Sequence, residues 1–176
     1  QLPVKPPQIF VETLRNEALF LRSFQYGPVA GFPELREKFL AHLSNTRKVD
    51  FQKAHFDCLV SNGAKQSFAN VMAALLNSGD EVITISPYWI SYPQVIQYYG
   101  GKLVDVKTSF HSGFIPNVSE IEHKITEKTK MIILNSPNNP TGVLYSESWM
   151  KEFAAMIKKY PDVWIVSDEI YHDIVY

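Results

Sequence analysis

The sequence predicts an α/β fold, in which a mostly parallel sheet is flanked by helices in three layers. After Asp50, short apolar segments alternate with amphipathic segments of helical length, an order typical of βαβ units. Most of the apolar segments are nearly continuous runs, as expected of strands covered on both faces. Ligands bind at the carboxyl ends of the strands in open sheets of this kind. Functional residues are therefore expected where the predicted strands end.

Five strands and six helices are predicted. The strands are 57–61, 81–85, 102–106, 130–134 and 163–167, and all but the third are near-continuous apolar runs. Four helices between or beside them are 64–76, 91–99, 119–125 and 146–159, the last with Ser146 as a plausible N-cap. Upstream, apolar side chains at helical spacing predict a helix over 8–21. Pro33 and Glu34 suit the first turn of another helix over 33–43.

Composition excludes several classes of protein. The net charge of −1 is spread along the chain, so neither nucleic acid nor an anionic membrane is expected as a partner. No apolar run approaches the roughly 20 residues that span a bilayer, so we expect a soluble protein. A single cysteine, Cys58, allows no internal disulfide and fits a reducing, cytoplasmic location. The histidines lack metal-site spacing, and no dinucleotide, P-loop or G-x-S-x-G motif is present. No metal is therefore expected.

The segment SNGAKQ (61–66) joins a predicted strand to a predicted helix. Gly63 allows the backbone to approach a ligand, and the first N–H groups of the helix form a potential anion site. The alternative is a purely structural glycine followed by Lys65 as an exposed helix lysine. The next segment, SPYW (86–89), places Trp89 after a strand, where it could stack on a flat heteroaromatic ligand or simply fill the core.

Two further strand ends carry polar side chains. The segment NSPNNPTG (135–142) contains Asn139, whose amide can donate to a phenolate or carboxylate oxygen, although it also resembles an ordinary turn. In SDEIY (167–171), Asp168 follows an apolar strand, and a buried acid there needs a partner. That partner could be a cationic ligand, a Lys or Arg elsewhere, or the start of a following helix.

In this order and spacing, the four segments resemble the class I, fold-type I, pyridoxal-phosphate-dependent aminotransferases. YGPVAGFPELR (26–36) is similar to the segment that precedes the cofactor domain in that family, so the resemblance covers 26–176. SNGAKQ and SPYWISYP are closest to the bacterial aspartate aminotransferase branch. The resemblance implies an N-terminal helical segment over 1–25 and part of the large, cofactor-binding domain over 26–176.

The resemblance also implies roles for individual residues. Asp168 would pair with the pyridinium nitrogen of pyridoxal 5'-phosphate, and Asn139 and Tyr171 would bond the phenolic oxygen of the ring. Trp89 would stack on the ring, and Trp89 and Asn139 would also lie near the carboxylate of the substrate. The turn at Gly63 and the N–H groups of Ala64 and Lys65 would bind the phosphate. Tyr26 would reach the phosphate in the neighbouring subunit of a homodimer.

One essential residue of the family is missing from the sequence. The Schiff-base lysine of the family lies downstream of the tyrosine that Tyr171 matches, and Lys65 matches the phosphate loop instead. We therefore expect no catalytic residue in this chain, which would be an inactive part of a longer protein. The intact protein would move an amino group between an amino acid, aspartate before aromatic amino acids, and a 2-oxo acid. A C–S β-lyase of the same fold and a non-catalytic cofactor-binding or structural module are the alternatives.

Overall fold

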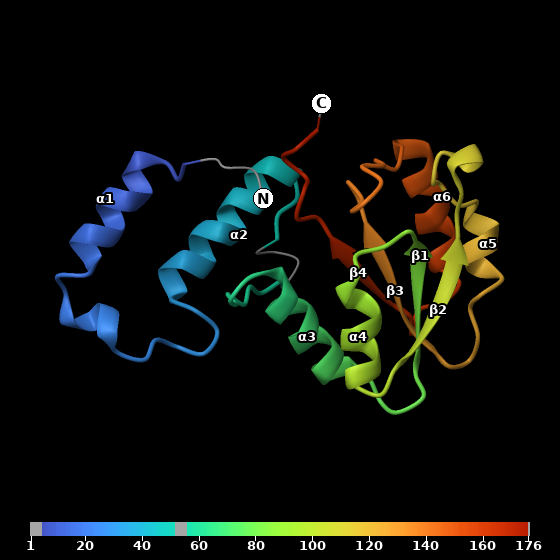
Figure 1. The fold of residues 1–176 in the computed structure, drawn as a ribbon, viewed down its shortest axis with the longest axis horizontal. Helices are drawn as coiled ribbons and strands as arrows, with labels where there is room; N and C mark the ends of the chain where they lie inside the picture. Colours follow the sequence, from blue (N-terminus) through green and yellow to red (C-terminus); the bar gives the residue numbers. More distant parts are fainter. Residues whose placement is uncertain (1–4, 52–55, 176) are drawn as a thin grey trace. The chain divides into compact units, whose positions relative to one another are not determined.

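The computed structural model describes residues 5–51 and 56–175. By its internal contacts the chain divides into two compact units, 1–61 and 62–176. The ribbon in Figure 1 shows helices in the first unit and a sheet with helices in the second.

The first unit contains two α-helices and a 3-10 turn among its described residues. Helix α1 spans Gln8–Glu17, η1 spans Leu21–Phe24 and α2 spans Pro33–Arg47. The helix predicted over 8–21 is therefore shorter than expected. Helix α2 begins with Pro33 in its first turn and Glu34 beside it, as predicted, and extends beyond residue 43 to a left-handed Lys48. Neither α-helix has a buried residue.

The prediction of a strand over 57–61 is wrong, since these residues have no regular secondary structure. The segment is held instead by isolated contacts: the Arg36 guanidinium donates to the carbonyl of Cys58 at 2.6 Å, and the Val60 N–H donates to the carbonyl of Ala30 at 2.9 Å. A strand requires a ladder of hydrogen bonds to a neighbour. No described strand forms such a ladder with this apolar segment.

The second unit contains a four-stranded, fully parallel sheet. Its strands are β1 (Glu81–Ser86), β2 (Lys102–Lys107), β3 (Thr129–Asn135) and β4 (Trp164–Asp168), in the order β2-β1-β3-β4. The helices are α3 (Ala64–Leu75), α4 (Ser91–Tyr98), α5 (Val118–Glu122) and α6 (Glu147–Ile157), with η2 at Phe110–Ser112. These elements confirm the predicted α/β class, and each strand lies within about two residues of its predicted range.

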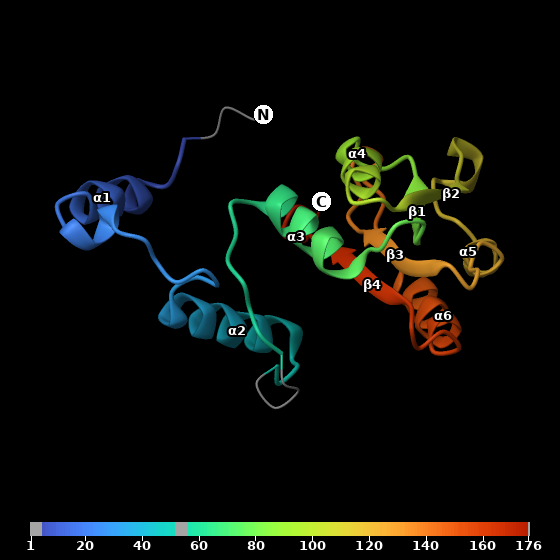
Figure 2. The same ribbon diagram turned by 90° about the horizontal axis from the view of Figure 1, so that it is seen from below.

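Alternate residues of the central strands enter two separate cores. Val82 of β1 and Met131 of β3 pack with residues of α3 and α4, whereas Ile83 and Ile132 pack with residues of α5 and α6. Since successive side chains of a strand point to opposite faces, one apolar run fills both cores. Figure 2 shows α4 on one side of the sheet and α6 on the other. This three-layer arrangement explains why residues 131–134 of β3 form a continuous apolar run.

Strand β4 differs from the expectation of full burial. It lies at one edge of the sheet, and Trp164 keeps 53% and Ile165 37% of their surface exposed. Strand β3 covers one side of β4, and no described strand pairs with the other. The apolar run correctly identified the strand but not its place in the sheet.

Candidate functional site

The carboxyl ends of β3 and β4 and the start of α3 surround a cavity of about 280 Å³ in the second unit. It brings together residues from all four of the segments that were singled out in the sequence. The lining residues are Asn62, Gly63, Ala64, Lys65, Trp89, Asn135, Asn139, Asp168, Ile170 and Tyr171. Every predicted cofactor-binding residue except Tyr26 is among them, although the positions span more than a hundred residues of sequence.

The start of α3 forms one wall of the cavity. Gly63 is the N-cap, with φ at +81° and ψ at 167°, a conformation that side chains strongly disfavour. The N–H groups of Ala64 and Lys65 open the helix and have no acceptor within it. No acidic residue occupies the first turn, so its partial positive charge is not neutralised locally. This wall can bind an anion.

Trp89 lies between the helix start and the core. Its ring is half-buried, stands edge-on to Tyr92 with 5.6 Å between ring centroids, and also lines the cavity. The ammonium of Lys65 lies 5.1 Å from the centre of the Trp89 ring. Trp89 is therefore both a packed side chain and an exposed aromatic face, and the core and ligand interpretations are compatible.

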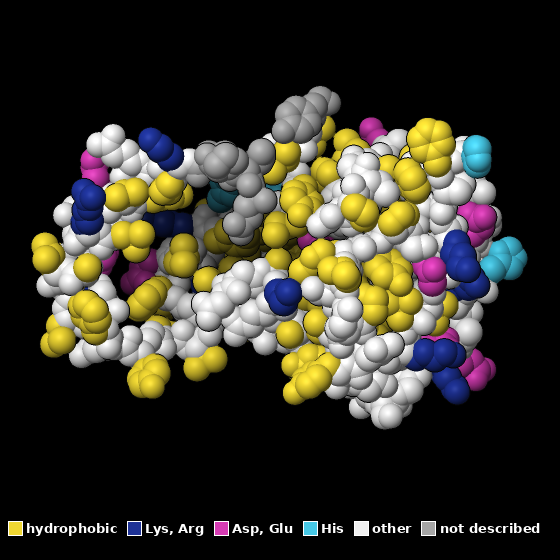
Figure 3. All heavy atoms as spheres, in the orientation of Figure 1, with side chains coloured by type: hydrophobic (Ala, Val, Ile, Leu, Met, Phe, Trp, Pro, Cys, Tyr) yellow, Lys and Arg dark blue, Asp and Glu magenta, His cyan; other side chains and the backbone are white. Residues whose placement is uncertain are grey.

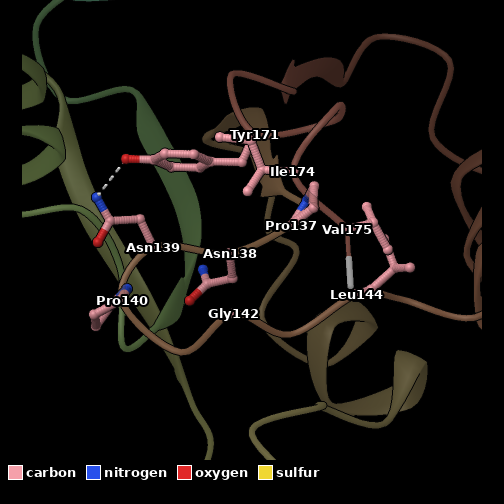
Figure 4. Close-up of a pocket in the computed structure, with 9 residues that line it drawn as sticks. All are labelled: Pro137, Asn138, Asn139, Pro140, Gly142, Leu144, Tyr171, Ile174 and Val175. Atoms are coloured by element: carbon pink, nitrogen blue, oxygen red, sulfur yellow. Dashed lines mark hydrogen bonds between the residues drawn. The ribbon is translucent and has the colours of Figure 1, made fainter. Parts of the chain in front are cut away.

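Asn135, the last residue of β3, organises the loop that follows it. Its side-chain oxygen accepts the N–H of Asn139 at 2.8 Å, and its amide donates to the carbonyl of Asp168 at 2.9 Å. The Asn139 amide in turn donates to the hydroxyl of Tyr171 at 3.2 Å. Figure 4 shows these two side chains pointing toward one another across the rim of a second, more open cavity of about 520 Å³. The loop is thus fixed to β4 rather than free.

Asp168 is the last residue of β4, and its carboxylate is held by a tyrosine. The Tyr92 hydroxyl donates to Oδ2 of Asp168 at 2.6 Å, while Oδ1 accepts the N–H of Ile170 at a long 3.3 Å. Burial, and then the bond to Asp168, raise the pKa of Tyr92, so this phenol stays protonated and remains a donor. Among residues 5–51 and 56–175, no Lys or Arg forms an ion pair with Asp168.

Sequence reasoning missed several members of this site. Asn62 and Ile170 line the cavity beside predicted residues, while Asn135 and Tyr92 hold predicted residues in place. Tyr92 follows Trp89 by three positions, one turn into the next helical segment, and this spacing could have identified it. Nothing local in the sequence pairs Tyr92 with a carboxylate 76 positions away.

Tyr26 belongs to the first unit and does not line the cavity of the second. Its side chain is fully exposed. A role toward a neighbouring subunit remains a prediction for this residue.

Charged side chains of both signs are present on the face shown in Figure 3. Neither the basic nor the acidic side chains form a large patch on this face. Two of the ion pairs join Lys102 to Glu81 and Lys159 to Glu122. Within the described residues, no helix combines the length and apolar character that a membrane span requires.

Comparison with known families and structures gives a concordant result. The sequence profile of the family described as "Aminotransferase class I and II" matches residues 4–176. The chain belongs to the class I and II aminotransferase family. The cavity lies where the four sequence segments converge.

Similar proteins include aspartate/prephenate aminotransferases of Thermus thermophilus (37% identical over 166 residues, 94% of this chain and 42% of the relative) and Cereibacter sphaeroides (36% over 152 residues, 86% and 38%). Among solved structures, the aspartate aminotransferase of T. thermophilus with maleate aligns at a TM-score of 0.89 and 34% identity, and that of Rhizobium meliloti at 0.91 and 30%. These alignments cover 99% of this chain and 44% and 43% of the solved chains. The chain thus spans less than half the length of its relatives.

Proposed function

We propose that this chain is the pyridoxal-phosphate-binding part of an aminotransferase. The observation that carries the proposal is the convergence of Asp168, Asn139, Tyr171, Trp89 and the Gly63 turn on one cavity. These residues come from four separate segments, and each segment contributes a different kind of chemical group. A single ligand that is at once aromatic, cationic and anionic accounts for all of them.

The donors and acceptors around the cavity fit the cofactor group by group. The α3 N–H groups of Ala64 and Lys65 suit the phosphate, and Trp89 offers a face for the ring. The Asp168 carboxylate has no Lys or Arg partner among the described residues, and it lies at the end of β4 beside Asn135 of β3. A protonated ring nitrogen would supply the cationic partner that this carboxylate lacks.

When bound, pyridoxal phosphate supplies a protonated ring that accepts the electron pair released at Cα of an amino acid. Asp168 would keep the proton on the ring nitrogen, and the ring needs that proton to accept the electron pair. Asn139 and Tyr171 donate to the phenolic oxygen and lower its basicity. Trp89 would fix the plane of the ring and exclude water from one face, and Trp89 and Asn139 would contact the substrate carboxylate.

Within the described residues, the cavity holds binding and positioning groups but no second lysine to move the Cα proton. Lys65 is the one lysine among the lining residues, and its ammonium lies over Trp89 at the phosphate end. A lysine contributed by the remaining length of the protein would perform that step. The substrates would be an amino acid, aspartate by the names of the similar proteins, and a 2-oxo acid. A homodimer with a cytoplasmic location, in which Tyr26 reaches the partner's phosphate site, completes the proposal.

The decisive experiment compares the intact protein with its Asp168→Ala variant. We expect the wild type to bind pyridoxal phosphate with a visible absorbance band and to convert aspartate in a single half-reaction. Asp168→Ala should slow this half-reaction by on the order of a hundredfold or more, because stabilising developing charge is usually the largest catalytic contribution.

Glu152→Ala, an exposed substitution on α6 outside the cavity, serves as the control and should behave as wild type. A near-normal half-reaction in Asp168→Ala would refute the role of this carboxylate. Pyruvate and ammonia release from cystathionine, with no transfer to 2-oxoglutarate, would favour a C–S β-lyase. Absence of any cofactor binding would favour a structural module.

A further inference from the structure

We propose that Tyr92 is a positioning residue of this site, which orients the Asp168 carboxylate toward the ring nitrogen of the cofactor through its hydroxyl. This inference deepens the proposed function and rests on it. Tyr92 is not one of the residues that line the cavity. It acts on the site through the lining residues that it contacts.

Tyr92 is placed to connect separate parts of the site. It is the second residue of α4 and only 1% exposed. Its ring packs against Phe68 of α3 at 5.0 Å and stands edge-on to Trp89 at 5.6 Å. Its hydroxyl reaches Asp168 on β4 at 2.6 Å. One side chain therefore joins the phosphate helix, the stacking tryptophan and the acid.

The bond to Tyr92 restricts how the Asp168 carboxylate can turn. A short bond from a neutral hydroxyl to a carboxylate is among the stronger hydrogen bonds in proteins. It holds Oδ2, so the carboxylate cannot rotate about its bond to Cβ without breaking it. Oδ1 accepts only the Ile170 N–H at 3.3 Å within the described chain, and it retains capacity for a second donor.

No described Lys or Arg pairs with Asp168, so a bound ligand can supply that second donor. Asn135 adds to the arrangement by holding the Asp168 carbonyl at 2.9 Å, which fixes the backbone while Tyr92 fixes the side chain. With one bond printed on each oxygen, the carboxylate keeps acceptor sites that no described residue fills. Burial of Tyr92 keeps its hydroxyl protonated, since its pKa is raised well above the usual value.

The test removes only the hydroxyl. Tyr92→Phe keeps the ring that packs on Phe68 and Trp89. In the intact protein, the dissociation constants of pyridoxal 5'-phosphate and of its 1-deaza analogue, in which a C–H group replaces the ring nitrogen, are measured by absorbance titration. We expect Tyr92→Phe to weaken the binding of pyridoxal phosphate about tenfold. This is the low end of the loss seen when an outer hydrogen-bond partner is removed at metal sites. Binding of the deaza analogue should not change, because it has no ring nitrogen for Asp168 to meet.

Tyr145→Phe is the matched control. Tyr145 is also a buried tyrosine, but it packs in the core on the α5 and α6 face and does not line the cavity. Its variant should bind both ligands as the wild type does. The Asp168→Ala background provides a second check, since Tyr92→Phe should have no further effect on affinity once the carboxylate is gone.

Three outcomes would overturn the inference: unchanged affinity for pyridoxal phosphate, an equal loss for both ligands, or a full effect in the Asp168→Ala background. An equal loss would mean that Tyr92 acts by packing alone. If Tyr92→Phe does not fold, 3-fluorotyrosine at position 92 replaces it. Its more acidic hydroxyl should change the ratio of the two affinities, and an unchanged ratio would contradict the proposal. Failure of the wild type to bind either ligand would instead refute the proposed function.

Discussion

Gly63 offers the sharpest test of the phosphate site, because one added methyl group perturbs only the backbone. A Cβ at this position would meet no heavy atom within 4 Å, so Gly63→Ala creates no clash with a neighbour. The conformation itself, with φ at +81° and ψ at 167°, is nearly restricted to glycine and costs other residues on the order of 1–3 kcal/mol. The strain is thus separable from packing.

That strain must appear in one of two measurable quantities. If the turn keeps its shape, the free energy of unfolding falls by about 1–3 kcal/mol. If the turn relaxes, the N–H groups of Ala64 and Lys65 move away from the anion position. The affinity for pyridoxal phosphate then falls roughly 5- to 150-fold, which corresponds to the same free energy. Denaturant unfolding and cofactor titration of the intact protein, with inorganic phosphate as competitor, measure both quantities.

Gly113→Ala provides the comparison for this experiment. Gly113 also has a positive φ, +59°, and an added Cβ would meet nothing, but it follows η2 and does not line the cavity. Its variant should lose about 1 kcal/mol of stability and keep its affinity for the cofactor. Wild-type stability together with wild-type affinity in Gly63→Ala would refute the reasoning.

Three further predictions concern the rest of the site and the core. Tyr171→Phe removes the hydroxyl that Asn139 contacts, and it should raise the pH midpoint of the absorbance change of bound cofactor, because a donor to the phenolic oxygen is lost; an unchanged midpoint would contradict this role. Ile132→Ala removes a fully buried side chain of β3 and should lower the free energy of unfolding by about 2–5 kcal/mol, measured in urea; a loss below 1 kcal/mol would mean that this core is not packed as described. Glu81→Gln tests an electrostatic contribution. The Thr126 hydroxyl and Lys102 hold the pKa of Glu81 below its ordinary value of 4.5, so the carboxylate stabilises the fold above that pH and loses its effect as the pH falls through the lowered value. The difference in stability between Glu81→Gln and wild type should therefore be largest near neutral pH and vanish in acid, and a difference that persists unchanged in acid would exclude this mechanism.

Local sequence patterns identified most elements of the second unit. Near-continuous apolar runs located β1 and β3, because these strands are covered on both faces and bury most of their side chains. Ser146 was correctly assigned as an N-cap, since a serine side chain can accept the N–H three residues on, here Trp149 at 3.2 Å. Such features depend only on neighbours in the chain.

The same patterns failed where the answer depended on distant partners. The apolar run at 57–61 looks like a strand, yet no described strand pairs with it. The run of β4 predicted burial, but its position at the sheet edge leaves Trp164 half exposed. Pairing and coverage are properties of the assembled sheet, so an apolar run cannot specify them.

The sequence by itself determined the alternation of strands and helices, and the chemistry that follows each strand: a glycine turn, an aromatic ring, an amide loop and an acid. Only the tertiary structure decided that these groups line one cavity, and that Tyr92 holds Asp168 while Asn135 ties the loop to β4. The reason is physical. Parallel pairing brings the carboxyl ends of β3 and β4 to one edge of the sheet. The bonds of Asp168 to Asn135 and to Tyr92 join positions separated by 33 and by 76 residues, so they form only once that edge exists.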